Sequence, residues 1–395
     1  MNGNKTQGGV ISMGIRTPII TPGDGLLKIV ISSVAKAING DFHDGDIIAV
    51  TEAVVAIADS NFATYQDISA DIQKKFPGAK SLAVVDPIQS RNRFKKVLEA
   101  IAATPTLEKV YVVLTYPTDE VGNQLISDRM IKQKGCDIYS HTYTADEFYE
   151  TFGKPCHPFT GKDYIAEYIE ACNGKAEVVM CNNFALLPGL IECDDYLVCS
   201  IHRDEETRYD LLEGGVDAEH ILTLANIMNE SINGSGYNEE FGLYGSNAMD
   251  GDMLKLMPRN AAELVKAIQD EVLKCYGKKV EAMVYGDGAF KDPVGRIWEL
   301  ADPRVAVAAT EGLRGTPKEV KTKYLASKYP DKTPEELEAI IAEEVAKRKA
   351  TEDVTGEASL GTTPRQITDL VGSLCDLTSG SGHRQTPVIL VRNYL

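Results

Sequence analysis

Four short polar loops each follow an apolar, strand-like run and carry side chains that could bind an ion or a phosphate. One of them lies in VYGDGAFKDPVGR, where Asp287 comes directly after a β-prone run and Asp292 follows five residues later. Carboxylate oxygens are the ligands that Mg²⁺ and Mn²⁺ prefer. Arg296 could clamp a phosphate or a carboxylate. The alternative is a surface loop built from good turn residues.

The loop YPTDEVGN offers further oxygen ligands. Asp119 and Glu120 could present carboxylates to a hard cation, and Asn123 could add a carbonyl or a hydrogen bond to a ligand. A divalent ion held by Asp119 and Asp287, with Asp292 nearby, requires distant parts of the chain to converge. An ordinary solvated turn is the alternative.

The loop TSGSGHR, residues 378–384, is rich in small residues. Its backbone N–H groups could close around an anion, with His383 or Arg384 adding positive charge. It lacks the GK[ST] of a Walker A loop and is not a GxGxxG fingerprint. A flexible turn explains the same composition.

The loop SRNR places Arg91 and Arg93 between a predicted strand and a predicted helix. Two arginines at this position suit a carboxylate or a phosphate at a helix N-terminus. A solvated basic turn is the alternative reading.

These loops need a scaffold of alternating strands and helices. Apolar runs predict strands, and near-helical spacing of apolar residues after residue 25 predicts a helix. TPEELEAIIAEEVAKRKA predicts a helix that Thr333 caps and Glu336 completes as a capping box. We therefore expect an α/β or α+β fold with a mixed sheet. The expected strands are Ile47–Val50, Leu82–Val85, and the runs in EKVYVVLT, AEVVMCNN, DYLVCSIH, KVEAMVYGD and PVILVRNYL.

The order of predicted strands, helices and loops along the chain suggests a core lobe made from both ends of the sequence. Residues 1–14 are expected to form a flexible tail. Residues 15–123 and 276–395 are expected to form the core lobe, and residues 124–275 a large inserted or second α/β lobe. The inserted part contains the Gly-rich loop GSGYN, in which Tyr237 and Asn238 are candidate substrate contacts.

Composition narrows the class of protein. The chain has 395 residues, 43% apolar, with a net charge of −17. That acidic balance argues against a nucleic-acid or anionic-membrane binder, and no apolar run is long enough to span a membrane. Eight scattered cysteines without a CxxC pair indicate a reducing cytoplasm.

With these motifs assembled, the chain resembles the γ-glutamyl ligases of the deazaflavin coenzyme F-420. The resemblance lies in RTPIITPGDGL, DGDIIAVTEAVVAIAD, VYGDGAFKDPVGR and QITDLVGSLCDLTSGSGHRQTPVILVRNYL. The middle of the chain is similar to a longer bacterial branch, through SRNRF, YPTDEVGN, HPFTG, GSGYNEEFGLYGSN and VYGDGAFKDPVG. The resemblance implies a two-lobed, mixed-sheet ligase core with an α/β insertion, and a homodimer.

The resemblance also implies residue roles. The family's first nucleotide segment falls on Thr17, Pro18, Ile19 and Ile20, and its second falls on Thr51 and Glu52. A lysine that the family usually has a few residues later is replaced here by Ile57. The C-terminal glycine-rich loop, also a nucleotide contact, falls on Ser379, Gly380, Ser381, Gly382, His383 and Arg384.

Metal and catalytic roles follow from the same resemblance. The family's metal acids match Asp119 and Asp287, and Asn123 matches a nucleotide-contacting asparagine. The acid of the family's C-terminal loop is missing, and Asp292 or Asp376 could replace it. Asp287 and Arg296 are the expected catalytic residues, and Arg91, Arg93, Tyr237 and Asn238 the expected substrate contacts.

The expected reaction is amide formation. GTP or ATP, with Mg²⁺ or Mn²⁺, would phosphorylate a small carboxylate, and the amine of L-glutamate would attack the acyl phosphate. Such chemistry depends on positioning and charge neutralisation more than on a protein nucleophile. Two alternatives stay open: a ligase of this family with another acceptor, or a nucleotide- or metabolite-binding module without ligase activity.

Overall fold

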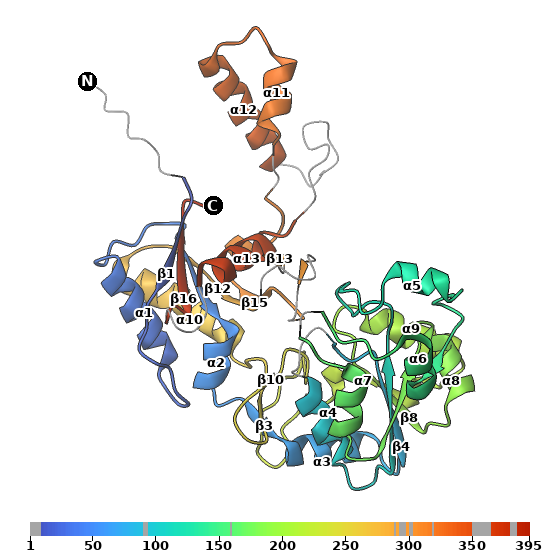
Figure 1. Cartoon of the computed structure of the whole chain (residues 1–395). Helices are drawn as coiled ribbons and strands as arrows, with labels where there is room; N and C mark the ends of the chain where they lie inside the picture. The colour runs from blue at the N-terminus through green and yellow to red at the C-terminus, as the bar shows by residue number, and fades with distance from the viewer. Residues whose placement is uncertain are drawn as a thin grey trace.

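The computed structural model describes residues 9–89, 94–158, 160–287, 290–291, 298–299, 303–317, 320–349, 365–379 and 385–395. Strands and helices alternate along the chain, and the sheets contain both parallel and antiparallel pairs, as expected for a mixed α/β fold (Figure 1). In these ranges no helix is both long and apolar enough to cross a membrane.

A five-stranded sheet joins the two ends of the chain, in the order β1-β16-β2-β12-β15. β2 and β12 are parallel, and the other neighbours are antiparallel. Its strands are β1 (Ile11–Ile15), β16 (Val388–Arg392), β2 (Ile47–Thr51), β12 (Glu281–Tyr285) and β15 (Ala306–Ala309).

Both faces of this sheet are covered, because its strands alternate between two apolar clusters. Ile48, Val284 and Leu390 pack with helices α1 (Leu26–Ala37) and α10 (Ala261–Tyr276). The neighbouring positions in the same strands pack against α13 (Ile367–Ser379) on the other face. α2 (Glu52–Ala58) begins directly where β2 ends.

The flexible tail expected over residues 1–14 overlaps a strand. Residues Ile11–Ile15 form β1, an edge strand that pairs with all five residues of β16. The strand ends before Pro18, which has no N–H for the ladder. β1 therefore lies just upstream of Pro18, in a stretch that forms a strand by pairing with the far end of the chain.

The second large sheet has six strands, in the order β6-β7-β5-β4-β8-β9. All its neighbours are parallel except the edge pair β6–β7. Taken in chain order, the five parallel strands are arranged 3-2-1-4-5, the doubly wound order. They are β4 (Ser81–Val85), β5 (Lys109–Leu114), β7 (Ala176–Met180), β8 (Asp195–Val198) and β9 (Ile221–Thr223), with β6 (Tyr143–Thr144) at the edge.

Helices cover both faces of the six-stranded sheet. Buried side chains of the first helix group belong to the largest apolar cluster, and those of the second group pack on the opposite face. The first group is α3 (Tyr65–Lys75), α4 (Phe94–Ala102), α6 (Ala145–Phe152) and α7 (Tyr164–Ala171); the second is η1 (Phe184–Leu186), α8 (Leu187–Leu190) and α9 (Asp204–Glu213). α5 (Asp128–Gln133), η2 (Ala218–His220) and η3 (Leu224–Asn226) lie in the connections.

Strand pairing moves the boundary that we expected at residue 123. β4 and β5 precede that position, yet they pair in the six-stranded sheet and not with the core strands. Both are continuous apolar runs, as buried parallel strands are, so their sequence does not distinguish one sheet from the other. The chain leaves the five-stranded sheet after α2 and returns to it with α10 and β12.

The remaining elements link or extend the two sheets. β3 (Phe62–Thr64), β11 (Met253–Lys255) and β10 (Asn247–Ala248) form a small sheet, and β13 (Phe290–Lys291) pairs with β14 (Trp298–Glu299). η4 (Glu311–Leu313) follows β15. α11 (Thr322–Lys328) and α12 (Pro334–Lys349) project away from both sheets (Figure 1). The capping box is confirmed, because the amides of Thr333 and Glu336 donate to each other's side chains at 3.0 and 3.3 Å.

Candidate functional site

One edge of the five-stranded sheet collects segments from both ends of the chain. Parallel β2 and β12 end there together, with Thr51 opposite Tyr285. The amide of Thr17 donates to the carbonyl of Gln385 at 3.1 Å, and the amide of Thr51 donates to that of Pro387 at 3.0 Å. These contacts place two of the segments expected to contact a nucleotide, at Thr17 and at Thr51, beside Gln385 and Pro387, which come just after the third.

Asp287 and Ser379 belong to the same edge. Asp287 is half-buried and stands two residues beyond β12. The amide of Gly286, before it, donates to the carbonyl of Val305 at 2.9 Å. Ser379 ends α13, and its carbonyl accepts a hydrogen bond from the hydroxyl of Thr386. A helix end and a strand end therefore meet at this edge of the sheet.

Thr17 and Pro18, the first half of the segment Thr17–Ile20, border an open pocket of about 750 Å³. Thr17 is buried and its hydroxyl donates to the carbonyl of Pro18 at 2.8 Å. Ile19 is 75% exposed. The pocket lies between this segment and α1, and its lining includes Ser32, Ser33 and Lys36.

Glu52 carries a cation partner that sequence reasoning missed. Lys255 of β11 forms an ion pair with its carboxylate, and both side chains are 6% exposed. Ile57, at the place of the family's lysine, is half-buried. A positive charge is thus supplied beside Glu52 from a segment 203 residues away. Spacing along the chain could not have indicated it.

Asp119 is buried and organises its own loop. Its Oδ1 accepts the amides of Val121 at 3.1 Å and Asn123 at 2.7 Å. Its Oδ2 accepts the side-chain amide of Asn123 at 2.8 Å and lies 2.9 Å from Nε2 of His157. A buried carboxylate requires such partners, and here they occupy both oxygens. This arrangement does not fit a metal ligand. HPFTG contains His157, but no spacing or motif indicated that its imidazole would reach Asp119, 38 residues away.

Tyr237 and Asn238 also have internal contacts. Asn238 is buried; its side-chain amide donates to the carbonyl of Pro258 at 2.9 Å, and its Oδ1 accepts two backbone amides. The side chain of Asn61 pairs with the backbone of Tyr237: its Nδ2 donates to the carbonyl at 2.9 Å, and its Oδ1 accepts the amide at 3.0 Å. Arg259 stacks over the Tyr237 ring, with its guanidinium carbon 4.7 Å from the centroid. Asn238 therefore shapes the loop, while the Tyr237 ring is half-buried.

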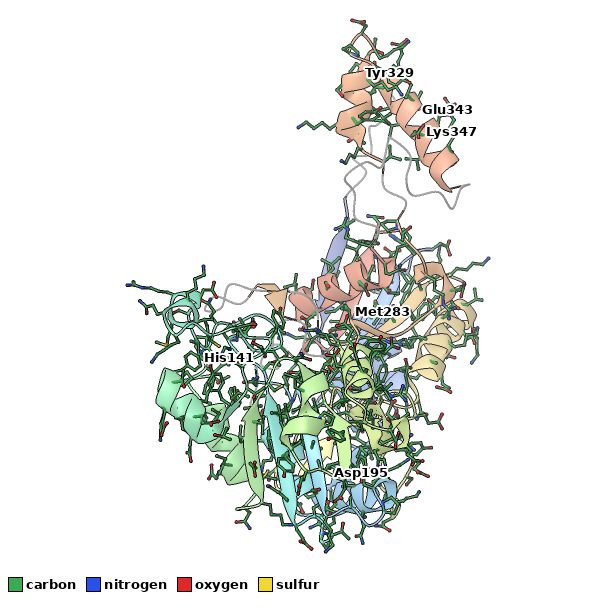
Figure 2. All side chains as sticks on the ribbon, turned by 90° about the vertical axis from the view of Figure 1, so that its right-hand side faces the viewer. His141, Asp195, Met283, Tyr329, Glu343 and Lys347 are labelled. Carbon is green, nitrogen blue, oxygen red and sulfur yellow. The ribbon has the colours of Figure 1, made fainter. Side chains whose placement is uncertain are left out.

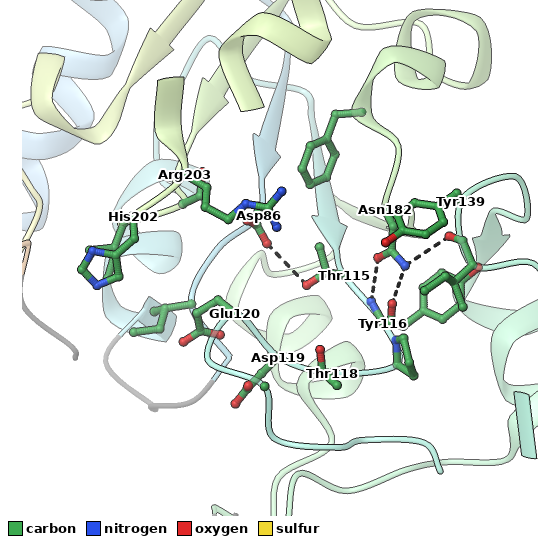
Figure 3. A pocket seen from close by; sticks show the side chains of 17 residues that line it. Asp86, Thr115, Tyr116, Thr118, Asp119, Glu120, Tyr139, Asn182, His202 and Arg203 are labelled. Carbon is green, nitrogen blue, oxygen red and sulfur yellow. Dashed lines mark hydrogen bonds between the residues drawn. The ribbon is translucent and has the colours of Figure 1, made fainter. Parts of the chain in front are cut away.

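A pocket of about 360 Å³ opens at the carboxyl ends of the parallel strands of the six-stranded sheet (Figure 3). The loops after β4, β5, β7 and β8 all line it. It therefore sits where the strand order reverses, the usual ligand position in doubly wound sheets. Its polar lining comprises Asp86, Thr115, Thr118, Asp119, Glu120, Asn182, Ser200, His202 and Arg203.

Asp86 is the most perturbed acid of this pocket. It follows β4 directly, is 6% exposed, and has a left-handed backbone with φ of 54°, which is uncommon outside glycine and marks stored strain. The hydroxyl of Thr115 donates to its Oδ1 at 3.4 Å. Burial raises the pKa of the Asp86 carboxyl to about 6, against the smaller opposing effects of the Arg203 guanidinium and Thr115. The sequence signal that could have indicated this residue is an aspartate that directly follows an apolar strand and precedes Pro87.

Arg203 and Glu120 border the same space. Arg203 is exposed at the start of α9, and its Nε donates to Glu206 at 2.8 Å. Its guanidinium is drawn facing Asp86 in Figure 3. Glu120 accepts the amide of Gln89 at 2.9 Å and so ties the loop after β5 to the loop after β4.

Residues 240–246 connect this pocket to the edge that holds Asp287. Arg304, just before β15, forms an ion pair with Glu240 at 2.7 Å. The hydroxyl of Tyr244 donates at 3.0 Å to the carbonyl of Ser200, which lines the pocket. In Figure 2, Asp195 at the start of β8 lies far below Met283, so the strand ends of the six-stranded sheet lie on the side toward the five-stranded one.

Several predicted site residues lie outside the described residues: Arg91, Arg93, Asp292, Arg296, Gly380, Ser381, Gly382, His383 and Arg384. Among the residues that are described, no group of three or more His, Cys, Asp or Glu side chains could hold a metal ion. Asp119 and Asp287 follow strands of different sheets.

Comparison with known proteins agrees with the resemblance drawn from the motifs. Residues 14–393 match the family described as F420-0:gamma-glutamyl ligase. A search of curated proteins gave no match. The family match extends through the six-stranded sheet as well as the five-stranded one, so both belong to the unit that the family describes. The chain is therefore a member of the F420-0:gamma-glutamyl ligase family.

Proposed function

We propose that this protein is a GTP- or ATP-dependent amide-forming ligase that adds L-glutamate, through a γ-glutamyl-type bond, to a small carboxylate acceptor. The observation that carries the proposal is the convergence of Thr17, Thr51 and Asp287 at one sheet edge, in a chain whose family match covers residues 14–393. A metabolite related to coenzyme F-420 is the acceptor that the family name suggests.

The reaction has two balanced steps. An acceptor carboxylate oxygen attacks the γ-phosphorus, the nucleoside diphosphate leaves, and an acyl phosphate forms. The amine nitrogen then attacks the acyl carbon, inorganic phosphate leaves with the former carboxylate oxygen, and the amine loses a proton. Neither step needs a protein nucleophile, so the chain contributes orientation and charge. The buried Lys255–Glu52 pair would fix the end of β2 beside the nucleotide.

The divalent metal that the family implies requires its own test. Asp287 is half-buried at the converging edge, so its carboxylate would suit a Mg²⁺ or Mn²⁺ ligand. Asp119 does not fit that role, because its oxygens already accept four hydrogen-bonding contacts. When bound, the ion would neutralise phosphate charge. Metal dependence is part of the proposal.

The first experiment is isothermal titration of the purified protein with GTP and with ATP, each with and without Mg²⁺ or Mn²⁺. Asp287→Asn is compared with wild type and with Asp250→Asn, an exposed aspartate near β11. We expect metal-dependent nucleotide binding that Asp287→Asn loses and Asp250→Asn keeps. Binding of neither nucleotide by wild type, or unchanged binding by Asp287→Asn, would refute this placement.

Ligase activity itself is tested by products. Incubation with nucleotide, L-glutamate and a panel of carboxylate acceptors, followed by mass spectrometry, should give a glutamylated acceptor and stoichiometric phosphate. Nucleotide binding without phosphate release with any acceptor would instead indicate a binding module. We also propose that the protein is a homodimer, which light scattering would test. We propose in addition that it resides in a reducing cytoplasm, where its eight cysteines would remain free thiols.

A further inference from the structure

The pocket at the carboxyl ends of β4, β5, β7 and β8 has no role in the nucleotide edge just described. It belongs to a complete doubly wound sheet with its own crevice at the reversal of strand order. Its volume of about 360 Å³ falls within the range of roughly 300–1,000 Å³ typical of small-molecule sites. A space of this kind indicates a second ligand.

The chemistry of the lining disfavours a nucleotide. The loop after β4 begins Asp86-Pro87-Ile88-Gln89 and has no glycine to let the backbone approach a phosphate. Among the described residues, three acids and one arginine line the pocket, namely Asp86, Asp119, Glu120 and Arg203, and the acids in excess would repel a polyphosphate. They would attract a cationic group.

Asp86 is a buried carboxylate that forms no ion pair with a described residue, although the Arg203 guanidinium faces it and lowers its pKa. In the described part of the chain its side chain has one hydrogen bond, the long contact of 3.4 Å from Thr115. It is 6% exposed, and a buried charge in this position calls for a counter-ion. The left-handed backbone at φ of 54° holds it at the strand end. Strain of this kind persists where the surroundings enforce it, and often at ligand sites.

Arg203 adds the opposite charge at the mouth of the pocket. Its side chain is 71% exposed, so its planar guanidinium can turn toward a ligand. Only its Nε is engaged by Glu206 among the contacts that the structure gives. The Arg203 guanidinium and the Asp86 carboxylate line the same pocket, and a base and an acid together match the two charged groups of a zwitterion.

We propose that this pocket binds an α-amino acid, with the ligand's ammonium group against the Asp86 carboxylate and its carboxylate against the Arg203 guanidinium. Resting on the proposed ligase function, the amino acid is the L-glutamate substrate. The 240–246 segment, which contacts both Ser200 and Arg304, would then connect the amino-acid pocket with the edge that holds Asp287.

The ionisation of Asp86 agrees with this arrangement. Burial raises the pKa of its carboxyl to about 6 in the free protein. An ammonium group beside it would stabilise the charged form and lower that pKa.

The test is a calorimetric titration of the full-length protein with L-glutamate, with and without a non-hydrolysable GTP analogue. Glutarate, which has both carboxylates but no amine, is the matched probe. The variants are Asp86→Asn and Arg203→Met, with Arg208→Met as control, because Arg208 is also exposed on α9 but does not line the pocket. Melting curves confirm that each variant is folded.

We expect wild type and Arg208→Met to bind L-glutamate, and Asp86→Asn and Arg203→Met to bind it about ten- to a hundredfold more weakly, the usual loss for a hydrogen bond to a charged group. Glutarate should bind far more weakly than L-glutamate. Three results would overturn the proposal: no binding with or without the analogue, equal binding of glutarate, or equal binding by Asp86→Asn and Arg203→Met.

These outcomes are separable from those of the ligase proposal. If wild type binds no nucleotide, the proposed nucleotide site at the edge of the five-stranded sheet is refuted, and binding of the amino acid can still be measured by itself. Nucleotide binding and product formation that survive Asp86→Asn and Arg203→Met with an unchanged Michaelis constant for L-glutamate would refute the pocket alone.

Discussion

Replacing Asp86 with asparagine should make the free protein more stable at neutral pH. The carboxyl is buried and its pKa in the folded protein is raised to about 6, from an ordinary value of 3.8. Above pH 6 the folded protein therefore holds a charge that the unfolded chain solvates better. Asparagine removes that charge, keeps a carbonyl for Thr115, and tolerates the left-handed backbone well.

The magnitude follows from the two pKa values. At about 1.4 kcal/mol per pH unit of difference, the buried charge costs about 3 kcal/mol at pH 7.5. Because the folded pKa is raised, the cost is absent below the unfolded pKa and develops between pH 4 and 6. At pH 4.5 the same linkage leaves about 1 kcal/mol. Besides Asp86 itself, the charged and titratable groups acting there are Arg203 and Cys199.

The assay is guanidinium denaturation followed by circular dichroism, at pH 4.5 and at pH 7.5, on wild type, Asp86→Asn and the exposed control Asp250→Asn. The free energy of unfolding of Asp86→Asn should exceed that of wild type by about 3 kcal/mol at pH 7.5 and about 1 kcal/mol at pH 4.5. Asp250→Asn should differ from wild type by less than about 0.5 kcal/mol at both. A gain that is the same at both pH values, or a loss at pH 7.5, would refute the reasoning.

Two further predictions concern buried charge pairs. Lys255→Met should destabilise the protein by roughly 3–5 kcal/mol, because it removes the buried cation that pairs with the Glu52 carboxylate. The double variant Glu52→Gln/Lys255→Met should recover most of this loss in denaturation curves, and additive losses would argue against a shared pair. His157→Ala should cost about 1–3 kcal/mol by removing a partner of the buried Asp119. Hydrogen exchange should localise that loss to residues 115–127, and unchanged protection there would contradict the role assigned to His157.

The sequence determined those features that depend on neighbours along the chain. The strands β2, β4 and β12 are short apolar runs closed by turn residues, and α12 is set by its capping box at Thr333 and Glu336. Motifs at the two ends were specific enough to indicate the ligase family, which the match over residues 14–393 confirms. The position of Asp287 near a strand end was also readable, because it stands two residues beyond the apolar run of β12.

Tertiary structure alone decided how these pieces combine. The sequence of an apolar strand does not specify which sheet it joins. The assignment of β4 and β5 to the six-stranded sheet therefore depended on their pairing partners. β1 formed because the chain's last strand pairs with it. Lys255 reached Glu52 across 203 residues. The burial and strain of Asp86 likewise arise from elements distant in sequence, since burial and electrostatics depend on distances in space, which local propensity does not specify.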